Sequence, residues 1–170
     1  MHPAKTISTD GIYRMLGTAL LCLELAGCGV AAAPPCPAEL DQTTQAPSAG
    51  CMALQQGKLL VVQNRTGRLS PPGGSAESGE SAQCTAFRET WEETGLHLQP
   101  SELLAVFDTG FHLYHCRHHP ESGELDPPQR FEVSDAFYLA PADFNDWEWR
   151  FPGQEETLRT LAEKAATSSP

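Results

Sequence analysis

Three glutamates are spaced so that their carboxylates can act together. Glu89, Glu92 and Glu93 stand at i, i+3 and i+4, so on a helix their side chains project from one face. Like charges held so closely repel one another, and a cation must offset them. Carboxylate oxygens are ligands that Mg²⁺ and Mn²⁺ prefer. The spacing therefore predicts a divalent-metal site, whereas the alternative is a solvated acidic helix face.

A basic residue and a tight turn stand next to these glutamates. Arg88 can bind a carboxylate through two parallel hydrogen bonds, and Glu80 is its candidate partner. Residues 71–74 read Pro-Pro-Gly-Gly, a stiff approach followed by a turn where backbone groups can come close to a ligand. Such a turn can offer a carbonyl to a metal or an amide to a phosphate. Together these features favour the metal site over the solvated face.

The glutamates need a helix to hold them, and the flanking residues predict one. Ser81 is a suitable N-cap, and the helical pattern continues to about Thr94. Gly95 follows, as glycine commonly does at a helix C-terminus. The glycine turn therefore leads directly into the helix that carries the carboxylates.

Residues 74–96, GSAESGESAQCTAFRETWEETGL, resemble the Nudix box, the signature of the Nudix hydrolases (MutT-type pyrophosphohydrolases). Thr90 departs from the family pattern, which usually has an aliphatic residue there. The defining positions are filled by Gly74, Glu80, Arg88, Glu89, Glu92, Glu93, Gly95 and Leu96.

The resemblance implies a reaction and residue roles. A metal-dependent enzyme would hydrolyse a diphosphate linkage in a nucleoside diphosphate-type substrate, with Mg²⁺ or Mn²⁺ as cofactor. The implied catalytic residues are Glu89, Arg88 and Glu80. The implied metal ligands are the carbonyl of Gly73 with Glu89, Glu92 and Glu93, and the implied substrate contacts are Gly74 and Arg88. Because every box carboxylate is present, an enzyme is favoured over a non-catalytic Nudix-fold nucleotide or metal-binding module in the cell envelope.

The N-terminal segment predicts export. Residues 15–27 form an apolar stretch after two basic residues, too short to cross a membrane but suited to a signal peptide. Residues 25–28 read Leu-Ala-Gly-Cys and resemble a bacterial lipobox. We therefore expect a signal peptide over residues 1–27, a lipid on Cys28 and a periplasmic, membrane-anchored lipoprotein of the bacterial cell envelope. Glu24 within the apolar stretch favours the alternative, a cytoplasmic enzyme.

The cysteines agree with export. Removal of Cys22 and lipidation of Cys28 would leave an even number, which fits disulfides in an oxidising compartment. Of the three possible connectivities, one pairing the first with the second and the third with the fourth is favoured, and four reduced thiols are the alternative. The four cysteines are Cys36, Cys51, Cys84 and Cys116.

Charge and composition define the remaining organisation. The formal net charge of −11 opposes binding to nucleic acid, so the expected partner is a small phosphorylated substrate, with a homodimer possible.

Residues 28–49 are rich in small and polar residues and are expected to form a flexible tether before a Nudix domain over residues 50–170. Strands are expected within residues 52–64, 102–108, 111–116 and 131–139, and a closing helix over 154–166. This order matches the α/β/α sandwich with a mixed sheet found across Nudix proteins.

Three features stay open. The histidines and Cys116 within residues 112–119 could bind a transition metal, although surface histidines beside a disulfide are favoured. The aromatic residues of segment 147–151 could pack in the core or stack a planar group. Nudix enzymes often draw a further glutamate from outside the box, for which the candidates are Glu121, Glu124, Glu132 and Glu155.

Overall fold

The computed structural model describes residues 32–128 and 131–167. The predicted signal peptide and the lipid on Cys28 lie outside the described residues. None of the helices within the described ranges is long and apolar enough to cross a membrane.

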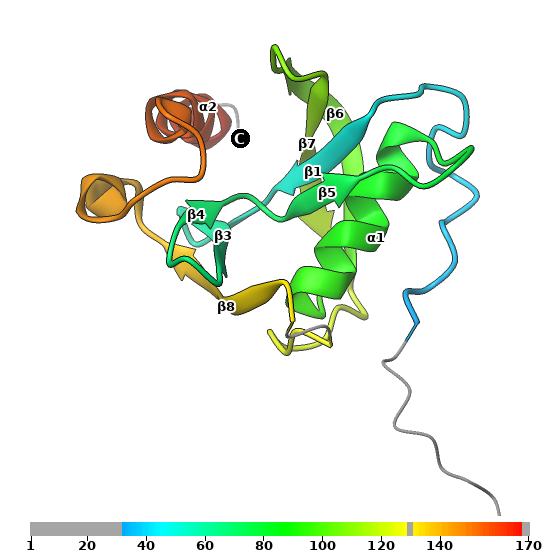
Figure 1. Cartoon of the computed structure of the whole chain (residues 1–170), viewed down its shortest axis with the longest axis horizontal. Coiled ribbons are helices and arrows are strands. Elements are labelled where there is room, and N and C mark those ends of the chain that lie inside the picture. The colour runs from blue at the N-terminus through cyan, green and yellow to red at the C-terminus, as the bar shows by residue number, and fades with distance from the viewer. Residues whose placement is uncertain (1–31, 129–130, 168–170) are drawn as a thin grey trace, which may run out of the picture.

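Two sheets form the centre of the molecule (Figure 1). The first has the strand order β5 (Gly73–Ser75), β1 (Ser48–Met52), β7 (Phe111–His118), β6 (Leu98–Val106). Its β1–β7 pairing is parallel and its other pairings are antiparallel, so the sheet is mixed. The second contains β2 (Leu54–Gln55), β3 (Lys58–Asn64) and β4 (Leu69–Ser70), with β8 (Val133–Leu139) paired to β3.

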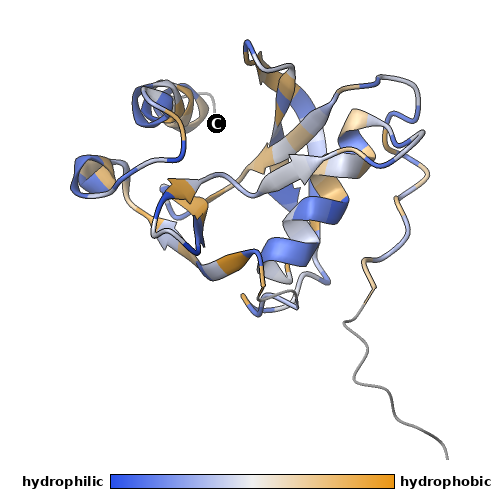
Figure 2. Ribbon diagram, in the orientation of Figure 1, coloured by the Kyte–Doolittle hydropathy of each residue, from blue (hydrophilic) through white to orange (hydrophobic). Residues whose placement is uncertain are grey.

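Helices cover both sides of these sheets. On one side α1 (Ala82–Thr94) packs over Ala49, Leu60 and Tyr114. On the other side α2 (Gln154–Thr167) and the 3₁₀ helix η1 (Pro141–Asp146) contribute to a second cluster. Alternation along β3 produces this division, because Leu60 faces one cluster and its neighbours Leu59 and Val61 face the other. The expected α/β/α fold is confirmed, and Figure 2 shows apolar colour on β3 and at the end of β1.

The predicted ends of the central helix are confirmed. Ser81 has an extended backbone, and its side chain accepts a hydrogen bond from the amide of Cys84 at 3.3 Å. Gly95 adopts the left-handed conformation (φ 75°), and its amide donates to the carbonyl of Trp91 at 2.7 Å. The glutamates therefore lie on a helix whose register is defined at both ends.

Part of the segment predicted as a flexible tether is ordered against the domain. β1 begins at Ser48, before the predicted domain start at residue 50, and Leu40 is buried. The carbonyl of Thr44 accepts from the amide of Ala82 at 2.8 Å, and that of Asp41 accepts from the hydroxyl of Ser81 at 2.7 Å. This N-terminal arm, residues 32–47, thus binds the first turn of α1, whose amides lack partners inside the helix.

All four cysteines predicted to pair are in disulfides, but the favoured connectivity is wrong. The structure joins Cys36 to Cys84 and Cys51 to Cys116. The arm runs beside the N-terminal end of α1, so Cys36 meets the helix rather than β1. Cys51 and Cys116 lie on the neighbouring parallel strands β1 and β7, in the core cluster that faces α1.

Candidate active site

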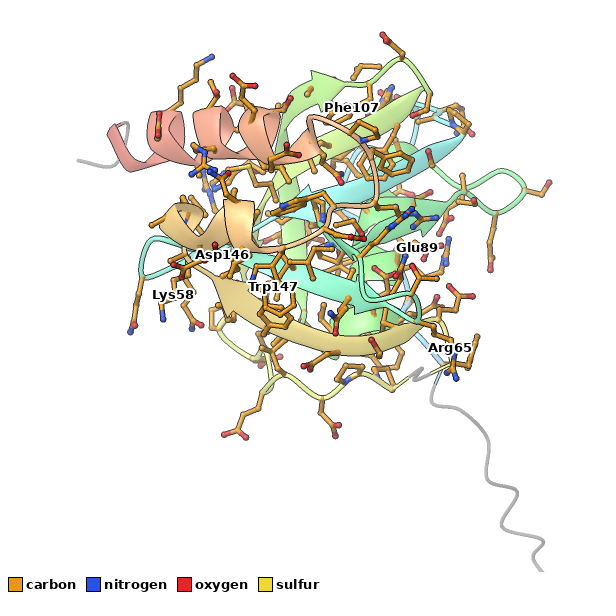
Figure 3. The ribbon with its side chains drawn as sticks, turned by 60° about the vertical axis from the view of Figure 1, so that its left-hand side comes forward. Lys58, Arg65, Glu89, Phe107, Asp146 and Trp147 are labelled. Carbon is orange, nitrogen blue, oxygen red and sulfur yellow. A yellow bond between two sulfur atoms is a disulfide. The ribbon has the colours of Figure 1, made fainter. Side chains whose placement is uncertain are left out.

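Arg88 collects the carboxylates of α1 at its centre. Its Nε and Nη2 donate to the two carboxylate oxygens of Glu80 at 2.8 and 2.9 Å, which confirms the predicted two-bond pairing. Its Nη1 donates to Glu89 at 2.8 Å and to Glu92 at 3.3 Å. Nη2 also donates to the carbonyl of Ser75 at 2.8 Å. Figure 3 shows carboxylate oxygens gathered around the labelled Glu89.

These bonds define what Arg88 can do. A guanidinium has five N–H donors, and the contacts above engage all five. The predicted direct contact of Arg88 with substrate would therefore require one of these bonds to break. The arrangement suits Arg88 to orienting the glutamates.

The glycine turn brings the backbone against the same carboxylates. The amide of Gly73 donates to Oε2 of Glu93 at 2.8 Å. A Cβ on Gly74 would lie 2.5 Å from the carboxylate carbon of Glu89, so a larger residue would displace that side chain. Gly73 itself has φ 153°, and a Cβ there would lie 2.5 Å from Cα of Gly50 on β1. Only glycines allow the turn to pass between β1 and the carboxylates.

Burial and hydrogen bonding shift the pKa values of the site glutamates. It raises the pKa of Glu93 to about 8, and the nearby charges of Glu89 and Glu132 add to this effect. Burial also raises the pKa values of Glu89 and Glu92, against the opposing charge and hydrogen bonds of Arg88. For Glu80, burial opposes ionisation, but the hydrogen bonds from Arg88 outweigh it together with those from the Glu77 amide and Thr85, so the pKa is lowered. Burial therefore favours the protonated forms of Glu89, Glu92 and Glu93, whereas Arg88 helps to keep Glu80 ionised.

This donor set fits a divalent cation. Within the described residues, each of Glu89, Glu92 and Glu93 uses one carboxylate oxygen in the hydrogen bonds above, which leaves the other as a ligand atom. Oxygen ligands from partly buried, mutually repelling carboxylates suit Mg²⁺ or Mn²⁺. Across residues 32–128 and 131–167, no group of three or more acidic, histidine or cysteine side chains is arranged to hold a metal ion.

Of the four glutamates proposed from outside the box, Glu132 acts on this site. It lies immediately before β8, and its charge raises the pKa values of Glu89, Glu92 and Glu93. Glu155 instead lines a separate surface hollow beside η1. Glu132 is thus the candidate that the fold brings to the box, which sequence spacing could not select.

The two other open features are the histidine region 112–119 and the aromatic segment 147–151, and the structure describes both. Cys116 is in a disulfide, while His112 and His118 contact the hydroxyls of Tyr114 and Tyr138 at 3.4 and 2.9 Å, so this region holds histidines beside a disulfide, as favoured. Trp149 packs on Phe144 with ring centroids 5.0 Å apart, as core packing predicts. Phe151, in contrast, is half exposed.

A cleft of about 390 Å³ adjoins the glycine turn. Its walls come from the turn, from the β6–β7 connection and from the segment leading into α2. Sequence reasoning did not assign these residues to one site, because they are separated along the chain and carry no shared motif. The lining includes Gly73, Gly74, Phe107, Asp108, Phe111, Arg150, Phe151 and Gln154.

Sequence comparison matches most of the described residues to one protein family. The profile of the NUDIX domain family matches residues 44–161. Nucleoside diphosphate-linked moiety X motif 6 of Xenopus laevis is 43% identical over 53 residues, covering 29% of this chain and 24% of that protein. An RNA pyrophosphohydrolase of Roseobacter denitrificans is 34% identical over 73 residues, covering 41% and 46%. The chain thus spans less than half the length of these curated relatives.

Solved structures share the fold. An ADP-ribose pyrophosphatase from Streptococcus suis superposes with a TM-score of 0.60 at 24% identity, covering 75% of this chain and 96% of that one. At this identity the likeness concerns the fold.

Proposed function

Since the chain belongs to the Nudix family, we propose that it is a Nudix hydrolase, a metal-dependent pyrophosphohydrolase acting on a nucleoside diphosphate-type substrate. The observation that carries the proposal is the contact of the Gly73–Gly74 turn with the carboxylates of Glu89 and Glu93. That contact places hard oxygen ligands against two glycines that also line the cleft.

Each site residue has a distinct role in the proposed reaction. Glu89, Glu92 and Glu93 would hold Mg²⁺ or Mn²⁺, with the Gly73 carbonyl completing the ligands. The bound metal would neutralise phosphate charge and lower the pKa of water. Glu89, which lies against Gly74, would accept the proton of the attacking water, and Glu132 is the candidate to assist it. Arg88 and Glu80 hold these side chains in position through their paired hydrogen bonds.

The electrostatics of the chain support metal dependence. The chain has a net charge of −11 and the site is itself acidic, so a diphosphate would be repelled. Arg88 is already engaged with carboxylates and adds little attraction. Entry of an anionic substrate would therefore depend on bound divalent cations.

The test is hydrolysis by the purified protein with Mg²⁺, Mn²⁺ or EDTA. The panel would contain ADP-ribose, NADH, nucleotide sugars, dinucleoside polyphosphates, coenzyme A and nucleoside triphosphates, with products separated by chromatography. Glu93→Gln should abolish metal-dependent turnover, whereas Glu163→Gln, an exposed change on α2, should not. Turnover that persists equally in EDTA or in Glu93→Gln would contradict the proposal.

We also propose that the protein is exported and anchored by a lipid on Cys28. The support is the Leu-Ala-Gly-Cys sequence at residues 25–28 together with two disulfides, which persist in oxidising compartments. Labelled palmitate should mark the wild-type protein expressed in a bacterium but not Cys28→Ser. An unlabelled protein in the cytosolic fraction would favour the cytoplasmic alternative.

A further inference from the structure

The two disulfides differ in how easily a reagent in solution reaches them. Cys51 and Cys116 are 0% and 2% exposed and lie in the core cluster that faces α1. Cys84 is 5% exposed, whereas its partner Cys36 lies half-buried on the N-terminal arm. Exchange with a disulfide requires a thiolate to reach one of its sulfurs. Among the four paired cysteines, Cys36 is therefore the one that a reductant reaches most readily.

The other end of the exposed bridge lies at the start of the central helix. Cys84 is three residues after the N-cap Ser81, in the first turn of α1, and residues 82–85 include no acidic side chain. The free amides of a first turn stabilise negative charge, including that of a thiolate. When a reductant attacks Cys36, Cys84 is the leaving group, and a stabilised thiolate leaves faster. Both ends of this bridge thus favour its reduction over that of the buried one.

The bridge fastens the arm at the place where the arm binds α1 (Figure 1). Besides the two bonds described above, the amide of Asp41 donates to Oε1 of Gln83 at 2.8 Å, and Leu40 is buried. Without the bridge the arm is joined to the domain only through β1, which begins at Ser48. These few contacts would then have to offset the conformational entropy of the whole arm. Reduction therefore permits the arm to open by local unfolding.

The arm and the active site share the residues that begin the helix. The hydroxyl of Ser81 donates to the arm, and Ser81 directly follows Glu80, which accepts two hydrogen bonds from Arg88. The hydroxyl of Thr85, in the first turn, also donates to Glu80 at 2.9 Å. The position of the Glu80 carboxylate thus depends on an ordered first turn.

Opening of the arm would weaken this order. The amide of Ala82 would lose its acceptor, the Thr44 carbonyl, and the end of the helix would fray. Glu80 would then no longer be fixed against Arg88, whose guanidinium also holds Glu89 and Glu92. Loss of such supporting contacts lowers the affinity of carboxylates for a metal.

We infer that Cys36 is a site of thiol–disulfide exchange, through which a dithiol reductant releases the arm and weakens divalent-metal binding by the glutamates of α1. This inference rests on the proposed function for the role of those glutamates as metal ligands. It adds a control by redox state that the hydrolytic chemistry does not require.

The exchange takes place in two steps. A thiolate of the reductant attacks the sulfur of Cys36, the bond to Cys84 breaks, and Cys84 leaves as a thiolate that takes up a proton. The second thiol of the reductant then attacks the mixed disulfide, and Cys36 is released as a thiol. The reductant ends as a disulfide, and the protein has gained two electrons and two protons.

The first measurement identifies the bridge that opens. The full-length protein would be incubated with graded dithiothreitol, and free thiols would be labelled with iodoacetamide and located by mass spectrometry. Cys36 and Cys84 should be labelled at reductant concentrations about 10-fold or more below those needed for Cys51 and Cys116. The two bridges opening together, or the buried bridge opening first, would overturn the inference.

Hydrogen exchange then tests release of the arm in samples that were reduced but not labelled. The amide of Ala82 should exchange faster than in the oxidised protein, because its acceptor lies on the arm. The amide of Gly95, which bonds to the Trp91 carbonyl at the other end of α1, is the internal control and should keep its protection. Unchanged exchange at Ala82 would contradict release of the arm, and faster exchange at both amides would indicate general unfolding instead.

Mn²⁺ binding without substrate tests the link to the glutamates, with free Mn²⁺ measured by electron paramagnetic resonance. Reduced wild type and Cys36→Ser/Cys84→Ser should bind Mn²⁺ about 10-fold more weakly than oxidised wild type. Reoxidation should restore the affinity of wild type. The double variant should bind equally with and without dithiothreitol, which controls for direct action of the reductant on the metal.

Unchanged Mn²⁺ affinity in a protein whose arm has opened would overturn the inference and leave the metal-dependent hydrolase proposal intact. If no diphosphate were hydrolysed while Mn²⁺ affinity still followed the redox state, the hydrolytic proposal would fail and the exchange site would stand. Circular dichroism at the assay temperature would check that the double variant is folded.

Discussion

Replacement of Glu93 by glutamine should change how stability depends on pH in metal-free buffer. In the folded protein the pKa of Glu93 is raised from 4.5 to about 8, chiefly by burial. Between these values the unfolded chain releases the proton while the folded chain keeps it, so the free energy of unfolding falls as pH rises. Each tenfold difference in proton affinity between the two states is worth about 1.4 kcal/mol, so the ceiling on this loss is about 5 kcal/mol, reached above pH 8.

Glu93→Gln lacks the titration and keeps a carbonyl oxygen to accept from the Gly73 amide. The variant should therefore equal wild type near pH 4.5 and exceed it progressively up to pH 8. Glu89 and Glu92 also have raised pKa values and lower the stability of both proteins, so the difference between the two curves isolates Glu93.

The assay is urea unfolding in EDTA at several pH values from 4.5 to 9, followed by tryptophan fluorescence. Glu163→Gln, exposed on α2, is the control for removing one charge and should follow wild type. Adding Mg²⁺ at pH 9 should stabilise wild type with a logarithmic dependence on concentration, and Glu93→Gln much less. Parallel curves for wild type and Glu93→Gln would refute the assignment of a buried, protonated carboxyl.

Three further changes test the site and its support. Gly74→Ala should reduce turnover about 100-fold with the fold retained, because the added Cβ would displace the Glu89 carboxylate. The control is Gly123→Ala, whose Cβ would lie in open space and should leave turnover unchanged. Kinetics would measure turnover and circular dichroism would check the fold of both variants. Arg88→Ala should lower the free energy of unfolding at pH 8 by about 3 kcal/mol, since partly buried carboxylates lose their cation; equal denaturation midpoints would contradict this. Replacing Cys36 and Cys84 by serine should cost about 2–4 kcal/mol in urea unfolding, and the unmodified native protein should show no free thiol among the four paired cysteines.

Local signals made the central helix and the strands within residues 52–64 predictable. Ser81 and Gly95 define the ends of α1 through their own backbone and side-chain chemistry, and Gln56-Gly57 adopts the positive φ values that the β2–β3 turn requires. The Arg88–Glu80 pairing was also predictable, because both residues belong to one short segment. Each of these features depends on neighbours in sequence.

Features that depend on distant segments were not predictable. β1 reads Ser-Ala-Gly-Cys-Met and lacks the bulky alternation of a typical strand, because Gly50 must lie against the Gly73 backbone. The disulfide pairing depends on the path of the arm beside α1 rather than on spacing. The cleft was hidden for the same reason, since its lining residues come from separate segments and carry no shared motif.

The two disulfides have a mechanical consequence. The covalent loops 36–84 and 51–116 overlap, because Cys51 lies inside the first and Cys84 inside the second. If the chain is pulled from both ends until it unfolds, the shortest covalent path from Cys36 to Cys116 follows about 15 residues to Cys51 and then crosses the bridge. Extension between these points would stop at roughly 50 Å, whereas the reduced chain would reach roughly 270 Å. Single-molecule pulling would therefore distinguish the two redox states by length alone.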